Sequence, residues 1–145
     1  MLTLQQEAGF RDLQKTHYDN AIKASFQFYQ TYVKNPNQYF AGFNVDNYLA
    51  SSLVVYNNSA PLQAQLEKII TQKYMTMFHQ GQWTSYQDYL RTGYPNLPLQ
   101  TGVSVPLRFR YPQVEYNYNK VNLQAALAAQ YGGQDNINSK PWWLQ

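Results

Sequence analysis

Cysteine is missing from the 145 residues, and charge is scarce, because Asp, Glu, Lys and Arg together make up only 13% of the chain. Without cysteine the chain can form no disulfide, no thiolate metal site, no cysteine nucleophile and no thiol-linked lipid. No apolar run approaches the roughly 18 residues that a membrane-spanning helix needs. The opening MLTLQQEAGF also lacks the basic segment and apolar run of a signal peptide.

Positive charge is in slight excess, with a formal net charge of +3 and a pI near 9.0. The basic residues are scattered singly, and the closest grouping, Arg108 and Arg110, flanks Phe109 instead of forming a stripe. A nucleic-acid-binding surface requires clustered Lys and Arg. We therefore expect a weakly basic solvated surface and no nucleic-acid partner.

Catalytic signatures are absent as well. His17 and His79 are the only imidazoles, and neither lies in a His-Glu-x-x-His pattern that would place two metal ligands on one helix face. No nucleophile elbow, Walker loop or dinucleotide fingerprint occurs. We therefore expect no metal, no cofactor and no enzymatic activity. A small glycoside hydrolase stays open as a further hypothesis, because it needs two carboxylates across a cleft. The candidates are Glu7, Glu67, Asp88, Glu115 and Asp135.

Aromatic residues are abundant instead: fourteen Tyr, seven Phe and three Trp, 17% of the chain, set among many Asn and Gln. This aromatic content supplies enough apolar area for a core, so the chain is expected to fold as a single domain over residues 1–145. Aromatic rings and amides also stack on and hydrogen-bond to neutral polar ligands such as sugars. The alternative is that Tyr packs the core while the amides replace charge on the surface.

Apolar periodicity predicts an all-α fold of about five helices and a long ordered loop that contains proline. The predicted helices span 11–34, 44–56, 61–80, 83–91 and 122–130, and the loop spans 93–112. Asn35-Pro36 ends the first helix, Asn44 or Asp46 caps the second, Asn122 caps the last, and Gly132-Gly133 ends it.

Each predicted helix has an expected core face. In the first helix the face comprises Ile22, Phe26, Tyr29 and Val33, and in the second it comprises Val45, Tyr48, Leu49, Ser52 and Val55. The third helix carries a stripe of Leu62, Leu66, Ile69, Ile70, Lys73, Tyr74, Met77 and Phe78. Its opposite face, which includes Gln72, is expected to meet solvent. Apolar residues of the loop, such as Val103 and Phe109, are expected to be buried.

Five sequence strings follow one another in a distinctive order: YDNAIKASFQFYQTY at 18–32, YLASSLVVYN at 48–57, LEKIITQKYMTMFHQGQWTSYQDYLRTGYPNL at 66–97, VPLRFRYPQVEYNYN at 105–119 and KPWW at 140–143. Together they resemble the C-terminal region of SusD/RagB-type outer-membrane nutrient-binding lipoproteins of Bacteroidetes, more closely the SusD-like subfamily. The resemblance covers nearly the whole chain.

The resemblance implies a surface-exposed lipoprotein of the outer membrane that captures glycans or other oligomeric nutrients beside a SusC-type TonB-dependent transporter. Such proteins are several times longer and predominantly helical. We therefore expect this chain to be a fragment without the signal peptide and lipid anchor, and to be marginally stable or self-associating because it exposes apolar surface. The alternative function is a helical protein–protein interaction module that binds no sugar.

The strings that carry the resemblance are expected to be structural. Arg91, Arg108, Glu115 and Trp142 are predicted anchors, and Arg91 and Glu115 are expected to pair and to tie the loop to the fourth helix. Trp142 and Trp143 are expected to point to opposite sides of an extended tail, at least one of them docking on the core. For a sugar surface, the predicted ligand-binding residues are Trp83, Tyr86, Tyr116 and Tyr118.

Overall fold

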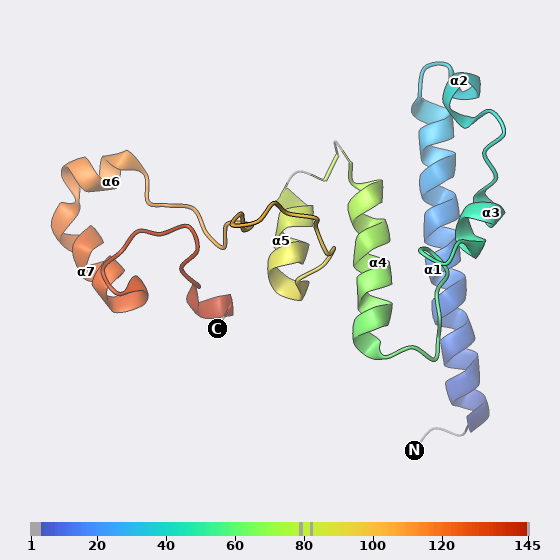
Figure 1. Cartoon of the computed structure of the whole chain (residues 1–145), viewed down its shortest axis with the longest axis horizontal. Helices are drawn as coiled ribbons and strands as arrows, with labels where there is room; N and C mark the ends of the chain where they lie inside the picture. The colour runs from blue at the N-terminus through green and yellow to red at the C-terminus, as the bar shows by residue number, and fades with distance from the viewer. Residues whose placement is uncertain (1–3, 79, 82, 145) are drawn as a thin grey trace. The chain divides into compact units, whose positions relative to one another are not determined.

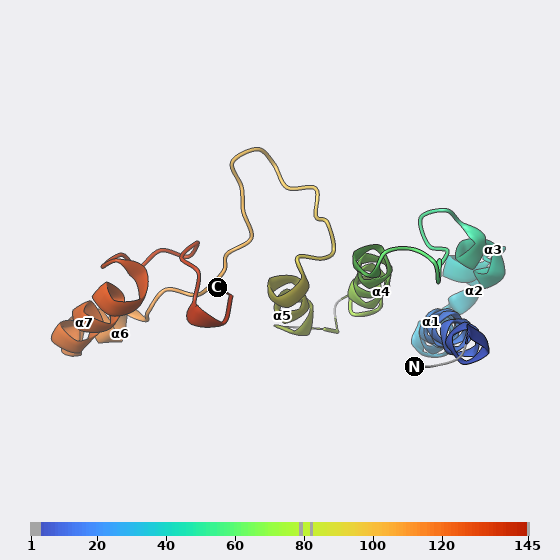
Figure 2. The same cartoon turned by 90° about the horizontal axis from the view of Figure 1, so that it is seen from below.

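The computed structural model describes residues 4–78, 80–81 and 83–144, and the side chains from residue 12 onward within this range. The described residues form helices, turns and loops without strands, so the predicted all-α class is confirmed (Figures 1 and 2). Their contacts divide the chain into two compact units. Unit 1 comprises Met1–Tyr89 and Tyr94–Asn96, and unit 2 comprises Leu90–Gly93 and Leu97–Gln145. The expectation of a single domain stays a prediction.

Unit 1 is built around the 29-residue helix α1 (Leu4–Tyr32), followed by α2 (Pro36–Phe40), α3 (Val45–Ala50) and α4 (Leu62–Thr76). In both views α4 runs beside α1 (Figures 1 and 2). Helix α5 (Trp83–Thr92) follows and crosses the boundary between the units. One cluster of four buried residues in this unit combines Tyr18 and Ile22 from α1 with Val54 and Tyr56 from the segment after α3.

Several boundaries in unit 1 differ from the prediction. The first helix ends two residues early at Tyr32, because Asn35 adopts a left-handed conformation (φ 65°) and Pro36 starts the short α2, which periodicity does not reveal. Helix α3 has its cap where expected, since the Asn44 side chain accepts from the Asn47 amide at 2.9 Å. It is much shorter than 44–56, because the chain turns extended at Ser51.

The core face of helix α4 shares Ile70 with the predicted stripe but otherwise differs from it. Its buried residues are Ile70 and Gln72, whereas Leu62, Ile69, Tyr74 and Phe78 are exposed. The helix ends at Thr76 and residues 77–78 form a turn, so the predicted extension of the helix beyond Thr76 is wrong. Residue 79, which falls within that extension, lies outside the described residues. Burial of Gln72 has a local cause: its Oε1 accepts a hydrogen bond from the Tyr48 hydroxyl at 2.9 Å.

Unit 2 contains α6 (Gln113–Tyr118), α7 (Lys120–Tyr131) and the 3₁₀ turn η1 (Trp142–Leu144). Helix α6 was not predicted, because its six residues are too few to show helical periodicity, and Pro112 precedes it. Asn119 occupies the N-cap position of α7, so the prediction of Asn122 as cap is wrong. Gly132 ends α7 in the left-handed conformation (φ 63°), as predicted.

The proline-containing loop has no helix between residues 93 and 112. Within unit 2 it is tied to the tail, because the amides of Leu107 and Arg108 both donate to the Ile137 carbonyl, at 2.8 and 3.2 Å. The expectation that all its apolar residues are buried is wrong, since Val103 and Phe109 are exposed. Backbone hydrogen bonds and a buried arginine order this end of the loop instead.

Candidate functional site

Two of the predicted ligand-binding residues lie at the start of α5, in unit 1. The rings of Trp83 and Tyr86 meet edge to face, with centroids 6.0 Å apart and planes at 66°. A helix brings residues three apart onto one side, so this pair follows from the sequence spacing. Trp83 is 59% exposed, whereas partial burial raises the pKa of the Tyr86 hydroxyl. Trp83 therefore offers a ring to solvent with Tyr86 beside it.

The other two predicted ligand-binding residues lie on α6, in unit 2, and have different surroundings. Tyr118 is 86% exposed. The Tyr116 hydroxyl donates to Asp135 Oδ2 at 2.7 Å, and this hydrogen bond raises the pKa of Tyr116. The hydroxyl of Tyr116 is thus already used inside the protein, while Tyr118 presents its ring to solvent.

The Asp135 carboxylate joins several parts of unit 2 through hydrogen bonds, a role that the sequence did not indicate. Its carboxylate accepts from Arg108 Nη1 at 2.6 Å, from the Tyr111 amide at 2.9 Å and from the Tyr116 hydroxyl. The Arg108 and Asp135 side chains are only 7% and 6% exposed. Burial works to raise the pKa of Asp135, but these hydrogen bonds and the Arg108 charge outweigh it and hold that pKa below its usual value. We call these four residues the Asp135 hub.

Aromatic rings complete the hub. The Arg108 guanidinium lies 4.2 Å from the ring centroid of Tyr131 and 5.3 Å from that of Tyr111. Arginine stacks well on such rings because its planar cation is weakly hydrated. The arrangement neutralises and holds Arg108 within unit 2. The sequence indicates this arrangement only through the Arg-Phe-Arg-Tyr-Pro string. That string predicts Arg108 as an anchor but does not identify Asp135 as its partner.

The remaining predicted anchors lie elsewhere. Arg91 is exposed in the last turn of α5, and the Glu115 carboxylate accepts a hydrogen bond from the Asn119 side chain at 2.8 Å. This bond lies within one helical turn, and the pairing of Glu115 with Arg91 stays a prediction.

The tail does not dock through tryptophan. Trp142 and Trp143 are 75% and 58% exposed, and the fully buried residue beside them is Pro141. The extended tail was wrongly predicted, because residues 142–144 form a 3₁₀ turn. The two rings meet each other edge to face, with centroids 5.7 Å apart and planes at 89°, instead of lying on opposite sides.

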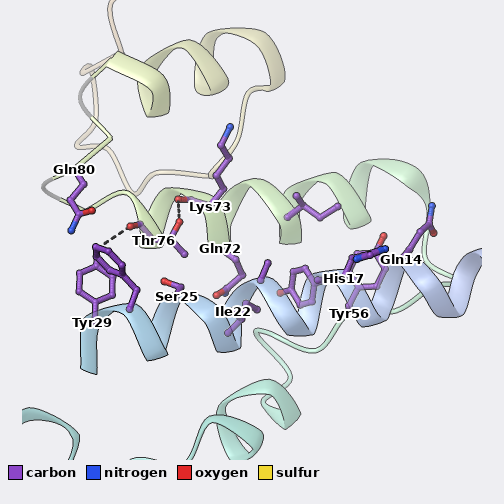
Figure 3. A pocket seen from close by; sticks show the side chains of 14 residues that line it. Gln14, His17, Ile22, Ser25, Tyr29, Tyr56, Gln72, Lys73, Thr76 and Gln80 are labelled. Carbon is purple, nitrogen blue, oxygen red and sulfur yellow. Dashed lines mark hydrogen bonds between the residues drawn. The ribbon is translucent and has the colours of Figure 1, made fainter. Parts of the chain in front are cut away.

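A groove with a volume of about 720 Å³ lies between α1 and α4 in unit 1 (Figure 3). Its floor includes the buried residues Tyr18, Ile22 and Tyr56, and its rim includes Gln14, His17 and Gln80. No local sequence pattern indicates this groove, because a groove depends on how far apart two helices pack. We call it the α1–α4 groove.

Three of the five carboxylates that are candidates for a hydrolase have structural partners. Asp88 pairs with Lys73 at 2.7 Å, Asp135 with Arg108, and Glu115 with Asn119, while the side chain of Glu7 lies outside the described part. No cluster of metal-ligating side chains occurs among the described residues. Within the same part of the chain, no helix is long and apolar enough to cross a bilayer.

Comparison with known proteins shows which family has this sequence and fold. Residues 4–112 match the family model SusD-like_2, described as starch-binding and associating with the outer membrane. A solved protein of Bacteroides vulgatus ATCC 8482, whose description links it to the outer membrane and to nutrient binding, is 45% identical, with a TM-score of 0.77. Two SusD homologues of Bacteroides fragilis NCTC 9343 are 40% and 30% identical, each with a TM-score of 0.76.

The three solved relatives are much longer than this chain. Each covers 90% of this chain, but only 29% or 30% of the solved relative, so the chain spans less than a third of their length. No curated protein matches the chain significantly. The family match covers most of the chain and both SusD homologues share its fold, and the chain belongs to the SusD-like family.

Proposed function

We propose that the chain is part of a non-enzymatic surface protein that captures neutral oligosaccharides, or other oligomeric nutrients, for a SusC-type TonB-dependent transporter of the outer membrane. The observation that carries the proposal is the match of residues 4–112 to a family described as starch-binding. The description of the B. vulgatus relative as involved in nutrient binding supports it.

Exposed aromatic rings supply contacts for such a ligand. Trp83 and Tyr118 present rings to solvent, and uncharged rings of this kind stack on the apolar faces of sugars. Tyr86 lies beside Trp83 and extends that surface. Tyr116 contributes to binding by positioning, because its hydroxyl is held by Asp135 and fixes the helix that carries Tyr118.

Native electrophoresis in gels containing soluble starch tests the proposal. We expect starch to retard the chain, and expect Trp83→Ala to remove most of the retardation, with Tyr118→Ala giving a smaller loss. Tyr39→Ala is the matched control, because Tyr39 is an exposed aromatic residue of α2 outside the predicted site. Absence of retardation by starch and by other neutral glycans would favour the alternative, a helical interaction module.

The transporter partner needs its own measurement. A tagged chain should retain a SusC-type transporter when both are produced in one membrane preparation, and the amount retained should not change in Trp83→Ala. Failure to retain any transporter would contradict this part of the proposal while leaving the starch result intact.

A further inference from the structure

An ion pair joins the side chains of α4 and α5 within unit 1. Lys73 Nζ on α4 lies 2.7 Å from Asp88 Oδ2 on α5. In Figure 3 the Lys73 side chain extends from α4 to the side away from α1. The Asp88 side chain keeps only 13% of its surface exposed, so solvent screens this pair less than it screens a pair on an open surface. We call it the Lys73–Asp88 pair.

A second contact lies on the same side of α5. The Ser85 hydroxyl donates to Met77 Sδ at 3.9 Å, and Met77 is the C-cap residue of α4. Because Ser85 and Asp88 are three residues apart, a helix places them on one side. Sulfur is a weak acceptor, so this contact adds direction more than strength. Together the two contacts oppose rotation of α5 about its own axis.

The rings of Trp83 and Tyr86 lie on a different side of α5. With 3.6 residues per turn, Asp88 stands roughly 140–160° around the helix from these two residues. The contacts with α4 and the pair of rings therefore use separate sides of one short helix. Any rotation of α5 moves both rings, so their orientation depends on what holds the other side of the helix.

Apolar burial alone fixes α5 weakly. The helix has ten residues, all of them in the described part of the chain, and none of them is buried. Helices shorter than about 12–15 residues are marginal on their own in water. Such a helix depends on contacts with its neighbours, and a sheltered ion pair is a directional contact. Binding in turn is tightest when the rings already have the orientation that the ligand needs.

We propose that Lys73 and Asp88 are positioning residues for the candidate sugar surface on α5. Their ion pair sets the orientation of the helix, and hence of the Trp83 and Tyr86 rings, while neither charged residue touches the sugar. The inference rests on the proposed function, because it assigns two further residues to the same surface. The two residues act as a unit, so the loss of either one has the same consequence as the loss of both.

The orientation of the rings can be measured without sugar. Trp142→Phe and Trp143→Phe leave Trp83 as the only tryptophan, so its fluorescence reports on α5 alone. In this background Lys73→Met removes the charge and keeps an unbranched stem. We expect the fluorescence anisotropy of Trp83 to fall, because a helix released from α4 gives its rings more freedom. Unchanged anisotropy would overturn the proposal.

Two further variants are controls for this measurement. Lys73→Arg keeps a positive charge beside Asp88 and should keep the anisotropy. Lys23→Met breaks the exposed pair with Asp46 elsewhere in unit 1 and should also leave the anisotropy unchanged. A fall in Lys23→Met equal to that in Lys73→Met would show a general effect of removing a lysine, and it would overturn the proposal.

Starch affinity provides the second test, measured in gels with a series of starch concentrations at a temperature where circular dichroism shows every variant folded. Lys73→Met and Asp88→Asn should each weaken binding about threefold, because only the fraction of molecules with correctly oriented rings binds. The double variant should lose no more than either single variant, and Lys73→Arg should retain the affinity. Additive losses in the double variant would overturn the proposal.

The outcomes also separate the role of the Lys73–Asp88 pair from sugar capture itself. If starch does not retard the unsubstituted chain, the proposed function is contradicted, and the anisotropy of Trp83 decides whether the pair positions the rings. If Trp83→Ala removes the retardation but Lys73→Met leaves it intact, the positioning role is overturned while sugar capture stands.

Discussion

The two units of the chain are stabilised by different physical means. The core cluster of unit 1 is uncharged, with Tyr18, Ile22, Val54 and Tyr56 packed together. The hydroxyls of its two tyrosines donate hydrogen bonds to the Val54 carbonyl and to the Gln65 side chain. Unit 2 buries Leu123 and Leu127 in α7, but its long loop is held by the Asp135 hub. A loop with little regular structure cannot bury a continuous apolar face, so a buried charge with several partners does the ordering instead.

Removal of Asp135 should have the largest effect on either unit. Asp135→Ala leaves the Arg108 charge buried without its partner, and breaking a buried pair in this way costs about 3–5 kcal/mol. Hydrogen–deuterium exchange should speed up over residues 104–112 and 131–139 and stay unchanged over residues 14–30.

The control for this prediction is Asp46→Ala, which breaks the exposed pair with Lys23 at 2.8 Å. The Asp46 hydrogen bond raises the pKa of Lys23, but exposed pairs of this kind contribute little to stability. If both variants destabilised the protein equally, burial would not be what makes the Asp135 hub important.

Truncation of Ile22 should destabilise unit 1 by a comparable or slightly smaller amount. Ile22→Ala removes a side chain that is 3% exposed, and such core truncations cost about 2–5 kcal/mol. Because the site borders the α1–α4 groove, partial collapse should keep the cost toward the lower end. Urea unfolding measures it, with Leu53→Ala as control, since Leu53 is exposed and should show almost no change.

Loss of a single hydroxyl should have a smaller effect. The buried Tyr18 hydroxyl donates to the Val54 carbonyl at 2.7 Å, and burial raises the pKa of Tyr18. Tyr18→Phe leaves that carbonyl without its partner, which costs about 1–3 kcal/mol. The urea midpoint should fall accordingly, whereas Tyr39→Phe on exposed α2 should leave it unchanged. An unchanged urea midpoint in Tyr18→Phe would show that a water molecule entering from the α1–α4 groove can take the place of the hydroxyl.

Replacement of the α3 cap should cost least among the substitutions. Asn44→Ala removes the hydrogen bond to the Asn47 amide, and N-cap losses of this kind cost about 1 kcal/mol. Faster exchange should be confined to residues 45–50. Asn20→Ala, at an exposed position within α1, should produce no destabilisation, and any equal loss there would indicate a general effect of removing an amide.

Comparison of these residues shows where sequence reasoning succeeded and where it failed. The core face of α1 was predictable because its apolar residues repeat with the helical period over several turns. Gln72 was assigned to solvent because periodicity sorts residues by polarity, and it cannot foresee that the Tyr48 hydroxyl satisfies a buried amide. The partners of Arg108 and the opening of the α1–α4 groove depend on contacts distant in sequence, which no local pattern contains. Trp142 and Trp143 were misplaced because one 3₁₀ turn replaced an extended tail.

The stability of the two units should respond differently to pH only in acid. Near neutrality, this difference should be the smallest of the predicted effects. The pKa of Asp135 lies below its reference value of 3.8, so its contribution is fully present above that value and is lost as pH falls through the folded pKa. Between about pH 7 and pH 5 the carboxylate is ionised whether the chain is folded or not, and this contribution should not change. In stronger acid, residues 104–112 and 131–139 should lose protection before residues 14–30, because none of the described residues buried in unit 1 is charged. Asp135→Asn should abolish that order, and an unchanged order in this variant would place the acid-sensitive group outside the Asp135 hub.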